Sequence, residues 1–98
     1  MAEIERIKTI SLAVPLKDEA LKTEYPVLIL KAPVLVQAEQ FYEKQASSSS
    51  LAAMRLLISL VSGVRESVLA HMDFIDFREC EEYLLGFLTW KPSAAGKN

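Results

Sequence analysis

Apolar and polar residues alternate near the start of the chain, over residues 4–16. The apolar positions of this alternation are Ile10, Leu12, Val14 and Leu16. A period of two predicts a strand with one buried face, and Pro15 marks its end or an edge position, because proline donates no ladder hydrogen bond. Residues 17–24 are polar and predict a connection, and the apolar run 25–31 predicts a second short strand. Two strands joined in this way predict an antiparallel hairpin, which needs helices packed against it to be stable.

From Pro33 onwards the spacing of apolar residues changes to that of helices. We predict helices over residues 33–45, 51–62 and 76–89, and a short helical turn between Val64 and Met72. The fold class predicted by this order is α+β, an N-terminal antiparallel β-hairpin followed by three or four short α-helices. Residues 1–90 are predicted to form a single domain. The small and polar residues 91–98 predict a flexible C-terminal tail.

Three local sequence features predict where these helices begin and end. Ser49 or Ser50 is a suitable N-cap for the second helix, and Gly63 is a suitable C-terminal stop for it. Asp76 followed by Glu79 fits the capping pattern of an acidic cap with a glutamate three residues later. The last helix is therefore expected to begin at Asp76.

The helix predicted over residues 51–62 is apolar almost all round. Its polar side chains, Arg55, Ser59 and Ser62, form one narrow stripe. Such a helix lies at the centre of its domain or faces a partner. We expect the side chains opposite the stripe to pack against the last helix and the hairpin; they are Leu57, Ile58 and Val61.

Composition narrows the possible classes of protein. Hydrophobic residues make up 51% of the chain and charged residues 24%, with a net charge of −2, a balance that disordered chains do not show. Neither half is strongly basic, so we expect no nucleic-acid partner. The single cysteine cannot form a disulfide within the chain. The apolar region 51–64 is interrupted and too short for a membrane span, and the charged N-terminus does not resemble a signal peptide.

Candidate catalytic and metal-binding chemistry is sparse. His71 is the one histidine, and Cys80 lies on the apolar face of the last predicted helix. Glu79, Glu81 and Glu82 form an acidic cluster, which we interpret as a solvated helix face. We therefore predict no catalytic residue, no metal site, no cofactor and no enzymatic activity.

A surplus of large apolar side chains is the remaining feature. The chain has more large apolar side chains than two strands and three short helices need to form a core. When such side chains form an exposed apolar patch, the patch often marks a protein-binding surface. The alternative is that all of them belong to the core. Our candidates for partner-binding residues are Phe41, Tyr42, Leu56, Leu60 and Trp90.

Several short motifs along the chain resemble, in their order, those of a known family. They are Val14-Pro15-Leu16, Val27-Leu28-Ile29-Leu30-Lys31-Ala32-Pro33, Gln37-Ala38-Glu39, Ser62-Gly63-Val64, Met72-Asp73-Phe74-Ile75-Asp76-Phe77 and Gly86-Phe87-Leu88. Over residues 7–90 the chain resembles the tail assembly chaperones of contractile-tailed, Mu-like phages. One departure is Val34, which stands where such proteins often place a Thr or Ser helix cap.

The resemblance implies a non-enzymatic role during phage or prophage tail assembly. Such chaperones are thought to bind the helical tape-measure protein and keep it soluble until tail tube subunits polymerise around it. The resemblance thus implies the tape-measure protein as partner, with tail tube subunits and a second copy of the chain as further candidates. It implies action in the host bacterial cytoplasm, without a membrane partner, and absence from the mature virion. The alternatives are a structural tail or head-completion subunit retained in the virion, and a small DNA-binding regulator.

Overall fold

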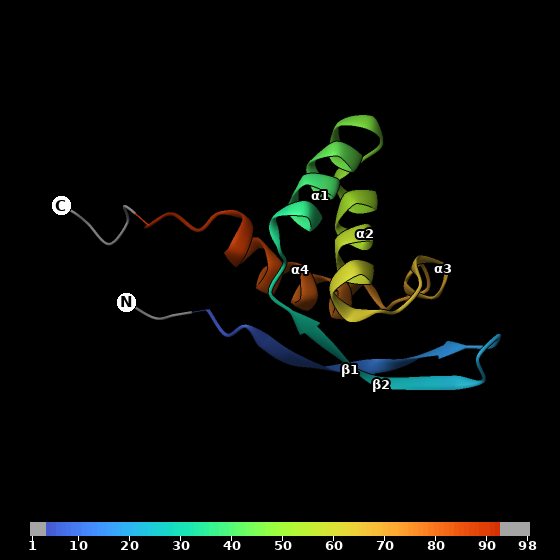
Figure 1. Ribbon diagram of the computed structural model, residues 1–98. Helices are drawn as coiled ribbons and strands as arrows, with labels where there is room; N and C mark the ends of the chain where they lie inside the picture. Colours follow the sequence, from blue (N-terminus) through green and yellow to red (C-terminus); the bar gives the residue numbers. More distant parts are fainter. Residues whose placement is uncertain (1–3, 93–98) are drawn as a thin grey trace.

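The computed structural model describes residues 4–92 and begins with a β-hairpin (Figure 1). Strand β1 (Ile7–Asp18) pairs antiparallel with β2 (Thr23–Lys31). The helices that follow are α1 (Leu35–Ser47), α2 (Ser50–Ser62), α3 (Glu66–Leu69) and α4 (Phe74–Leu88). The predicted α+β class, a hairpin followed by helices, is confirmed. Lys91 and Pro92 are exposed, and the rest of the predicted tail lies outside the described residues.

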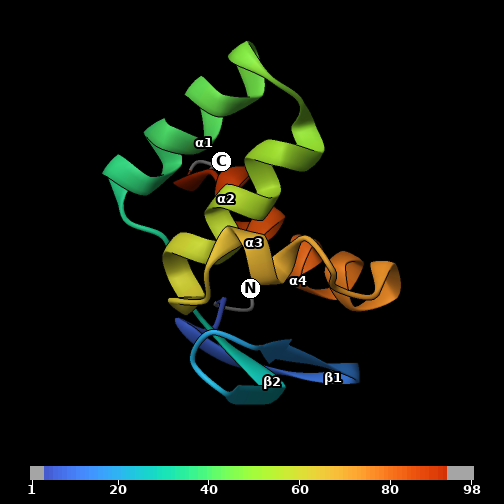
Figure 2. The same cartoon turned by 90° about the vertical axis from the view of Figure 1, so that its right-hand side faces the viewer.

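Within residues 4–92 the helices lie on one side of the hairpin, and no described segment covers the opposite face of the sheet (Figures 1 and 2). Helices α1 and α2 form an antiparallel pair above the sheet. Helix α2 packs against α1, α3, α4 and β2, while α4 packs against β1. The helix that is apolar almost all round is therefore central in the fold, which is the first of the two alternatives that its pattern left open.

Both ends of α2 are defined by the expected residues. The Ser49 hydroxyl accepts a hydrogen bond from the Ala52 N–H at 3.0 Å, so Ser49 is the N-cap. At the other end Gly63 has φ of 79°, in the left-handed region where glycine carries no steric penalty. The polar stripe of α2 turns toward the segment that follows it. Arg55 pairs with Glu66 at 3.4 Å, and the Ser59 hydroxyl donates to the Val64 carbonyl at 2.6 Å.

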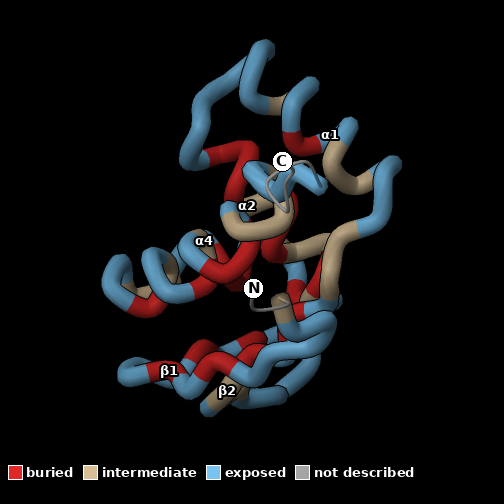
Figure 3. The backbone as a smooth tube through the Cα atoms, turned by 90° about the vertical axis from the view of Figure 1, so that its left-hand side faces the viewer, coloured by how far each residue is buried: buried red, intermediate tan, exposed pale blue. Residues whose placement is uncertain are grey.

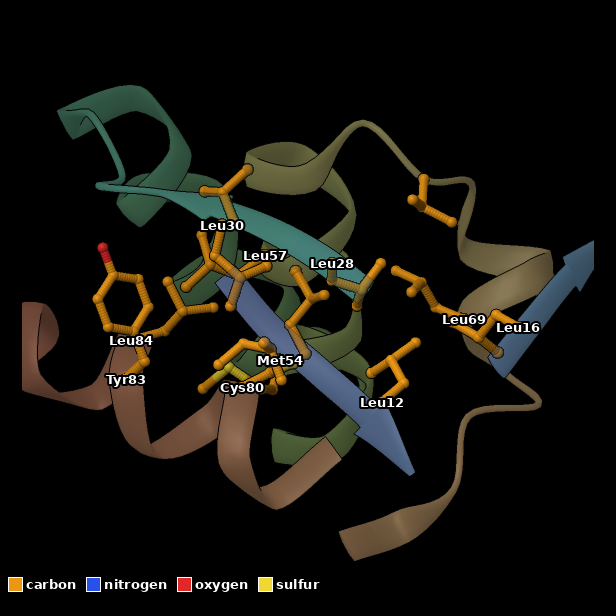
Figure 4. Close-up of a cluster of buried hydrophobic side chains, with 14 of the residues drawn as sticks. Leu12, Leu16, Leu28, Leu30, Met54, Leu57, Leu69, Cys80, Tyr83 and Leu84 are labelled. Atoms are coloured by element: carbon orange, nitrogen blue, oxygen red, sulfur yellow. The ribbon is translucent and has the colours of Figure 1, made fainter. Parts of the chain in front are cut away.

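The core lies between α2, α4 and the inner face of the sheet (Figure 4). Leu57, Ile58 and Val61 of α2 are buried, which confirms their predicted place. The same buried cluster includes residues of β2 and α4, namely Leu28, Leu30, Cys80 and Leu84. Its other members include Ile10, Leu12, Leu16, Phe41, Met54, Val64, Val68 and Leu69.

The start of α4 differs from the prediction. Asp73, rather than Asp76, is the N-cap, because its carboxylate accepts the N–H groups of Ile75 at 3.1 Å and Asp76 at 3.4 Å. The helix therefore begins at Phe74, before the predicted position. Both Asp73 and Asp76 have a side chain that suits the N-cap position. The Asp76 side chain instead binds residues of β1, so Asp73 is the residue that caps the helix.

Asp76 is buried and binds the backbone of β1. Its carboxylate oxygens accept the N–H of Ala13 at 3.0 Å and the N–H of Val14 at 3.1 Å. The pairing of β1 with β2 is interrupted at this point, so residues 12–15 lie opposite Pro26 alone. A bulge leaves backbone groups of the longer strand without ladder partners. The Asp76 carboxylate supplies these partners and ties α4 to the hairpin.

The bulge also turns Val14 outward. Its side chain is 51% exposed, although the alternation predicts that it shares the buried face with Ile10, Leu12 and Leu16. The prediction for Val14 is wrong because an irregular register changes the period of two within the bulge.

Strand β1 extends beyond its predicted end and finishes at a buried acidic residue. Asp18 was expected in a polar connection, but its side chain is only 1% exposed. Its carboxylate accepts two hydrogen bonds from the Arg65 guanidinium, at 2.6 and 3.2 Å, and one from the Leu21 N–H at 3.1 Å. Burial by itself raises the pKa of Asp18, but the hydrogen bonds and charge of Arg65 and the Leu21 N–H outweigh it, so the pKa lies below 3.8.

A lowered pKa makes Asp18 a source of acid sensitivity. The ionised carboxylate stabilises the folded state at pH values above its unfolded pKa, and this contribution is lost as the pH falls through the lower, folded pKa. We expect the stability difference between the wild type and Asp18→Asn to be constant near neutral pH and to shrink below about pH 4. Urea unfolding at a series of pH values measures this difference. A difference that stays unchanged into strong acid would contradict the role of Asp18.

Helix α1 is shifted slightly relative to the predicted range of 33–45. It begins at Leu35, with Val34 in the N-cap position. Valine has no side-chain acceptor, and the Gln37 side chain instead accepts the Val34 N–H at 3.0 Å. In a capping box the side chain of the third helical residue accepts the N–H of the N-cap residue. Gln37 makes this one of the two capping-box hydrogen bonds, so the Val34 N–H has a partner.

Candidate protein-binding groove

An open groove of about 800 Å³ lies where the start of α1, the end of α4 and the N-terminal segment meet. Figure 3 looks at this side of the molecule, where the start of α1 is mainly exposed. The groove is lined mainly by apolar side chains. Its lining residues are Ile4, Glu5, Arg6, Pro33, Val34, Leu35, Ala38, Tyr42, Phe87, Leu88 and Trp90.

Helix α1 forms one wall through a stripe of residues at helical spacing. Leu35, Ala38 and Tyr42 follow each other at i, i+3 and i+7, so they lie along one face. Leu35 is 76% exposed and Tyr42 is 50% exposed. The Tyr42 ring stands edge-on to the ring of Phe41, with their centroids 5.1 Å apart. Since Phe41 is buried, this contact supports Tyr42 from the core side.

The end of α4 forms the facing wall. Phe87 and Leu88 are half-buried, and the Phe87 ring stands edge-on to Tyr83 with centroids 5.2 Å apart. The Thr89 N–H donates to the Leu85 carbonyl and the Trp90 N–H to the Phe87 carbonyl, which keeps the chain turning after the helix ends. This turn brings Trp90 to the groove with 55% of its surface exposed.

The N-terminal segment forms the floor and is held on two sides. The Tyr83 hydroxyl donates a hydrogen bond to the Glu5 carbonyl, and the Ala32 N–H donates to the Arg6 carbonyl at 2.7 Å. Burial, together with the charge of Glu5, raises the pKa of Tyr83. A tyrosine hydroxyl is protonated at neutral pH even without such a shift, so Tyr83 is a donor there. The floor is therefore anchored to both α4 and the end of the hairpin.

The structure brings together some of the predicted partner-binding residues and separates others. Tyr42 and Trp90 are exposed and line the same groove, although they are far apart in sequence. Phe41 is buried in the core, which is the alternative stated for each of these residues, so Phe41 is not part of an exposed surface. Leu56 and Leu60 are half-buried on α2 and are not part of the groove lining.

Sequence analysis did not identify the residues that precede and begin α1. Val34, Leu35 and Val36 are all exposed, and the first two line the groove. A run of three apolar residues at a helix start covers too wide an arc to face one core. This run was the available sign of an apolar surface beside Tyr42.

The histidine and the acidic cluster considered as candidate chemistry do not line the groove. His71 is exposed, and of the acidic cluster Glu79 and Glu82 are exposed while Glu81 accepts a hydrogen bond from Arg78 at 2.6 Å. Within residues 4–92 no three His, Cys, Asp or Glu side chains are grouped to hold a metal ion. In the same part of the chain, every helix is too short or too polar to cross a membrane.

Cys80 is a core residue, as its place on the apolar face indicated. It is fully buried, and burial, together with the charges of Asp76 and Glu79, raises the pKa of its thiol to about 12. The thiolate is the reactive form of cysteine, so we expect Cys80 to resist alkylation at pH 8 in the folded protein. Intact-mass measurement after iodoacetamide treatment tests this, with a urea-unfolded sample as the positive control. Rapid alkylation of the folded protein would contradict the buried position.

The hairpin, the central α2 and the other helices form a small α+β fold with an open groove lined mainly by apolar side chains. The chain belongs to a family of phage tail assembly chaperones, the "phage tail assembly chaperone proteins, E, or 41 or 14", whose model matches residues 9–89. The match confirms the resemblance and includes the α1 wall of the groove. No curated protein and no solved structure matches the chain.

Proposed function

We propose that this chain is a non-enzymatic chaperone that binds the tape-measure protein during tail assembly. In this role it acts in the cytoplasm of the host bacterium and keeps the tape-measure protein soluble until tail tube subunits polymerise around it. It is then released and is absent from the mature virion. The observation that carries the proposal is the apolar groove, with Tyr42 on one wall and Trp90 on the other.

The groove has the properties that binding of an unassembled helix requires. A long helix destined for the tail lumen has an apolar stripe that is exposed to water before assembly. Amphipathic helices bind by placing such a stripe into an apolar groove. Aromatic side chains dominate the binding energy of many interfaces, and here Tyr42 and Trp90 each keep about half of their surface free to make contacts.

We expect Tyr42→Ala and Trp90→Ala each to weaken binding of the tape-measure protein by tenfold or more, since truncation of an anchor costs about 2 kcal/mol or more. The measurement is co-expression with the tape-measure protein of the same phage, followed by affinity capture and titration of the purified complex. Leu51→Ala is the matched control, because Leu51 is exposed on α2 and does not line the groove. Equal capture by all variants would contradict the assignment of these two residues.

A separate measurement tests release after assembly. Mass spectrometry of purified virions is expected to detect the tape-measure protein and the tube subunits without this chain. Detection of the chain at a stoichiometric level would instead support the alternative of a structural subunit that is retained in the particle.

A further inference from the structure

The two sides of the groove carry different charges. On α1, Glu39 lies four residues after Leu35 and three before Tyr42, so it adjoins the apolar stripe. Phe41, which is buried, marks the core side of the helix, and Glu39 therefore lies along the solvent edge of the stripe. Glu43 follows one helical turn later. Both glutamates are exposed, and neither is in an ion pair within residues 4–92.

The opposite side has a different balance. Arg6 and Glu5 both lie in the floor of the groove, and Lys91 directly follows Trp90. The floor therefore carries one cation and one anion, and Lys91 adds a cation next to Trp90 in the sequence, whereas the solvent edge of α1 carries two anions. Lys44, the nearest cation on α1, is half-buried and by helical spacing lies on the other side of the helix from Glu39.

The spacing of the α1 stripe suits a helix as occupant. Leu35, Ala38 and Tyr42 repeat at i, i+3 and i+7, which is the spacing of the contact positions in a coiled-coil seam. In coiled coils the charged residues beside this seam select partners and their orientation. Glu39 has the position of such a flanking residue, and Glu43 lies one turn later and further round the helix from the seam.

We propose that the groove takes an amphipathic helix whose apolar stripe is flanked, on the edge next to α1, by lysine or arginine residues. This inference rests on the proposed function and adds the charge pattern of the partner segment. The acidic edge attracts a basic flank and repels an acidic one, so it selects among the many apolar stripes that a long helical protein contains.

Two synthetic helical peptides about three heptads long test the proposal. They share one apolar stripe and differ only in their flanking residues, which are lysine in one peptide and glutamate in the other. Binding is measured by fluorescence anisotropy at low and high salt. We expect the lysine peptide to bind about 3- to 10-fold more tightly at low salt, because exposed charge interactions with Glu39, and more weakly with Glu43, contribute modestly. High salt is expected to reduce the preference by screening.

The charge-reversed double variant Glu39→Lys/Glu43→Lys is expected to abolish or reverse the preference. The matched control is Glu19→Lys/Glu24→Lys, which changes the net charge equally at exposed positions of the hairpin outside the groove. It is expected to keep the preference for the lysine peptide. Circular dichroism confirms that each variant is folded.

The outcomes distinguish this inference from the proposed function. Equal binding of both peptides to the wild type, or the same change in both double variants, would overturn the charge inference and leave the groove as a binding site. Failure of both peptides to bind would overturn both. If light scattering shows a dimer that Glu39→Lys/Glu43→Lys dissociates, the acidic edge faces a second copy of the chain, and the proposal is overturned.

Discussion

Leu57→Ala is expected to lower the free energy of unfolding by about 2–5 kcal/mol, the usual cost of emptying a fully buried leucine site. Leu57 has no exposed surface and lies in the cluster that joins α2 to the sheet and to α4 (Figure 4). The change removes apolar contacts and leaves a cavity that neighbours from several elements would have to fill together. Urea unfolding followed by circular dichroism measures the loss.

Leu51→Ala on the same helix is the control for this experiment. Leu51 is 53% exposed, so its truncation is expected to change stability by less than about 0.5 kcal/mol. Both changes delete the same atoms from a leucine of α2, and only the burial of the site differs. Similar losses for the two variants would contradict the central position of α2.

Asp76→Ala is expected to cost about 3 kcal/mol or more, because hydrogen bonds to a charged group contribute more than neutral ones and two are lost together. The carboxylate binds the N–H groups of Ala13 and Val14 in the bulge of β1. When the Asp76 carboxylate is removed, the N–H groups of Ala13 and Val14 lose their hydrogen-bond acceptor, and α4 loses this link to the hairpin. The measurement combines urea unfolding with hydrogen exchange of the Ala13 and Val14 amides, which is expected to accelerate.

Asp73→Ala distinguishes the two acidic residues at the start of α4. Asp73 is the N-cap, and its removal is expected to cost about 1 kcal/mol without faster exchange at Ala13 and Val14. Asp76→Asn is expected to fall between the wild type and Asp76→Ala, because an amide keeps one carbonyl acceptor and presents a donor in place of the other. If hydrogen exchange of the Ala13 and Val14 amides is unchanged in Asp76→Ala, the proposed link between Asp76 and the bulge of β1 would be contradicted.

The candidate site shows how far sequence reasoning reached. A surplus of large apolar residues indicated a binding surface, and Tyr42 and Trp90 do lie exposed in one groove. Phe41 is adjacent to Tyr42 in sequence, yet it is buried. Neighbouring helical positions point in directions about 100° apart, and the core side of α1 is set by its contact with α2.

Local sequence by itself determined the order and the type of the elements. The period of two predicted the hairpin, the helical period predicted the helices, and Ser49 and Gly63 defined the ends of α2. These features depend on the preferences of a few consecutive residues and on which side of an element is apolar. They hold whatever the element packs against.

Only the tertiary structure decided the features that depend on distant partners. Asp76 suits a helix cap as well as a buried acceptor, and the bulge of β1 determines that it binds Ala13 and Val14. Asp18 is polar, yet Arg65 allows it to be buried. The groove likewise exists because three segments distant in sequence meet at one end of the domain. Local sequence can indicate that a side chain is suited to a hydrogen bond or to an apolar surface. It does not indicate which remote residue will be the partner, so that pairing and its geometry come only from the folded chain.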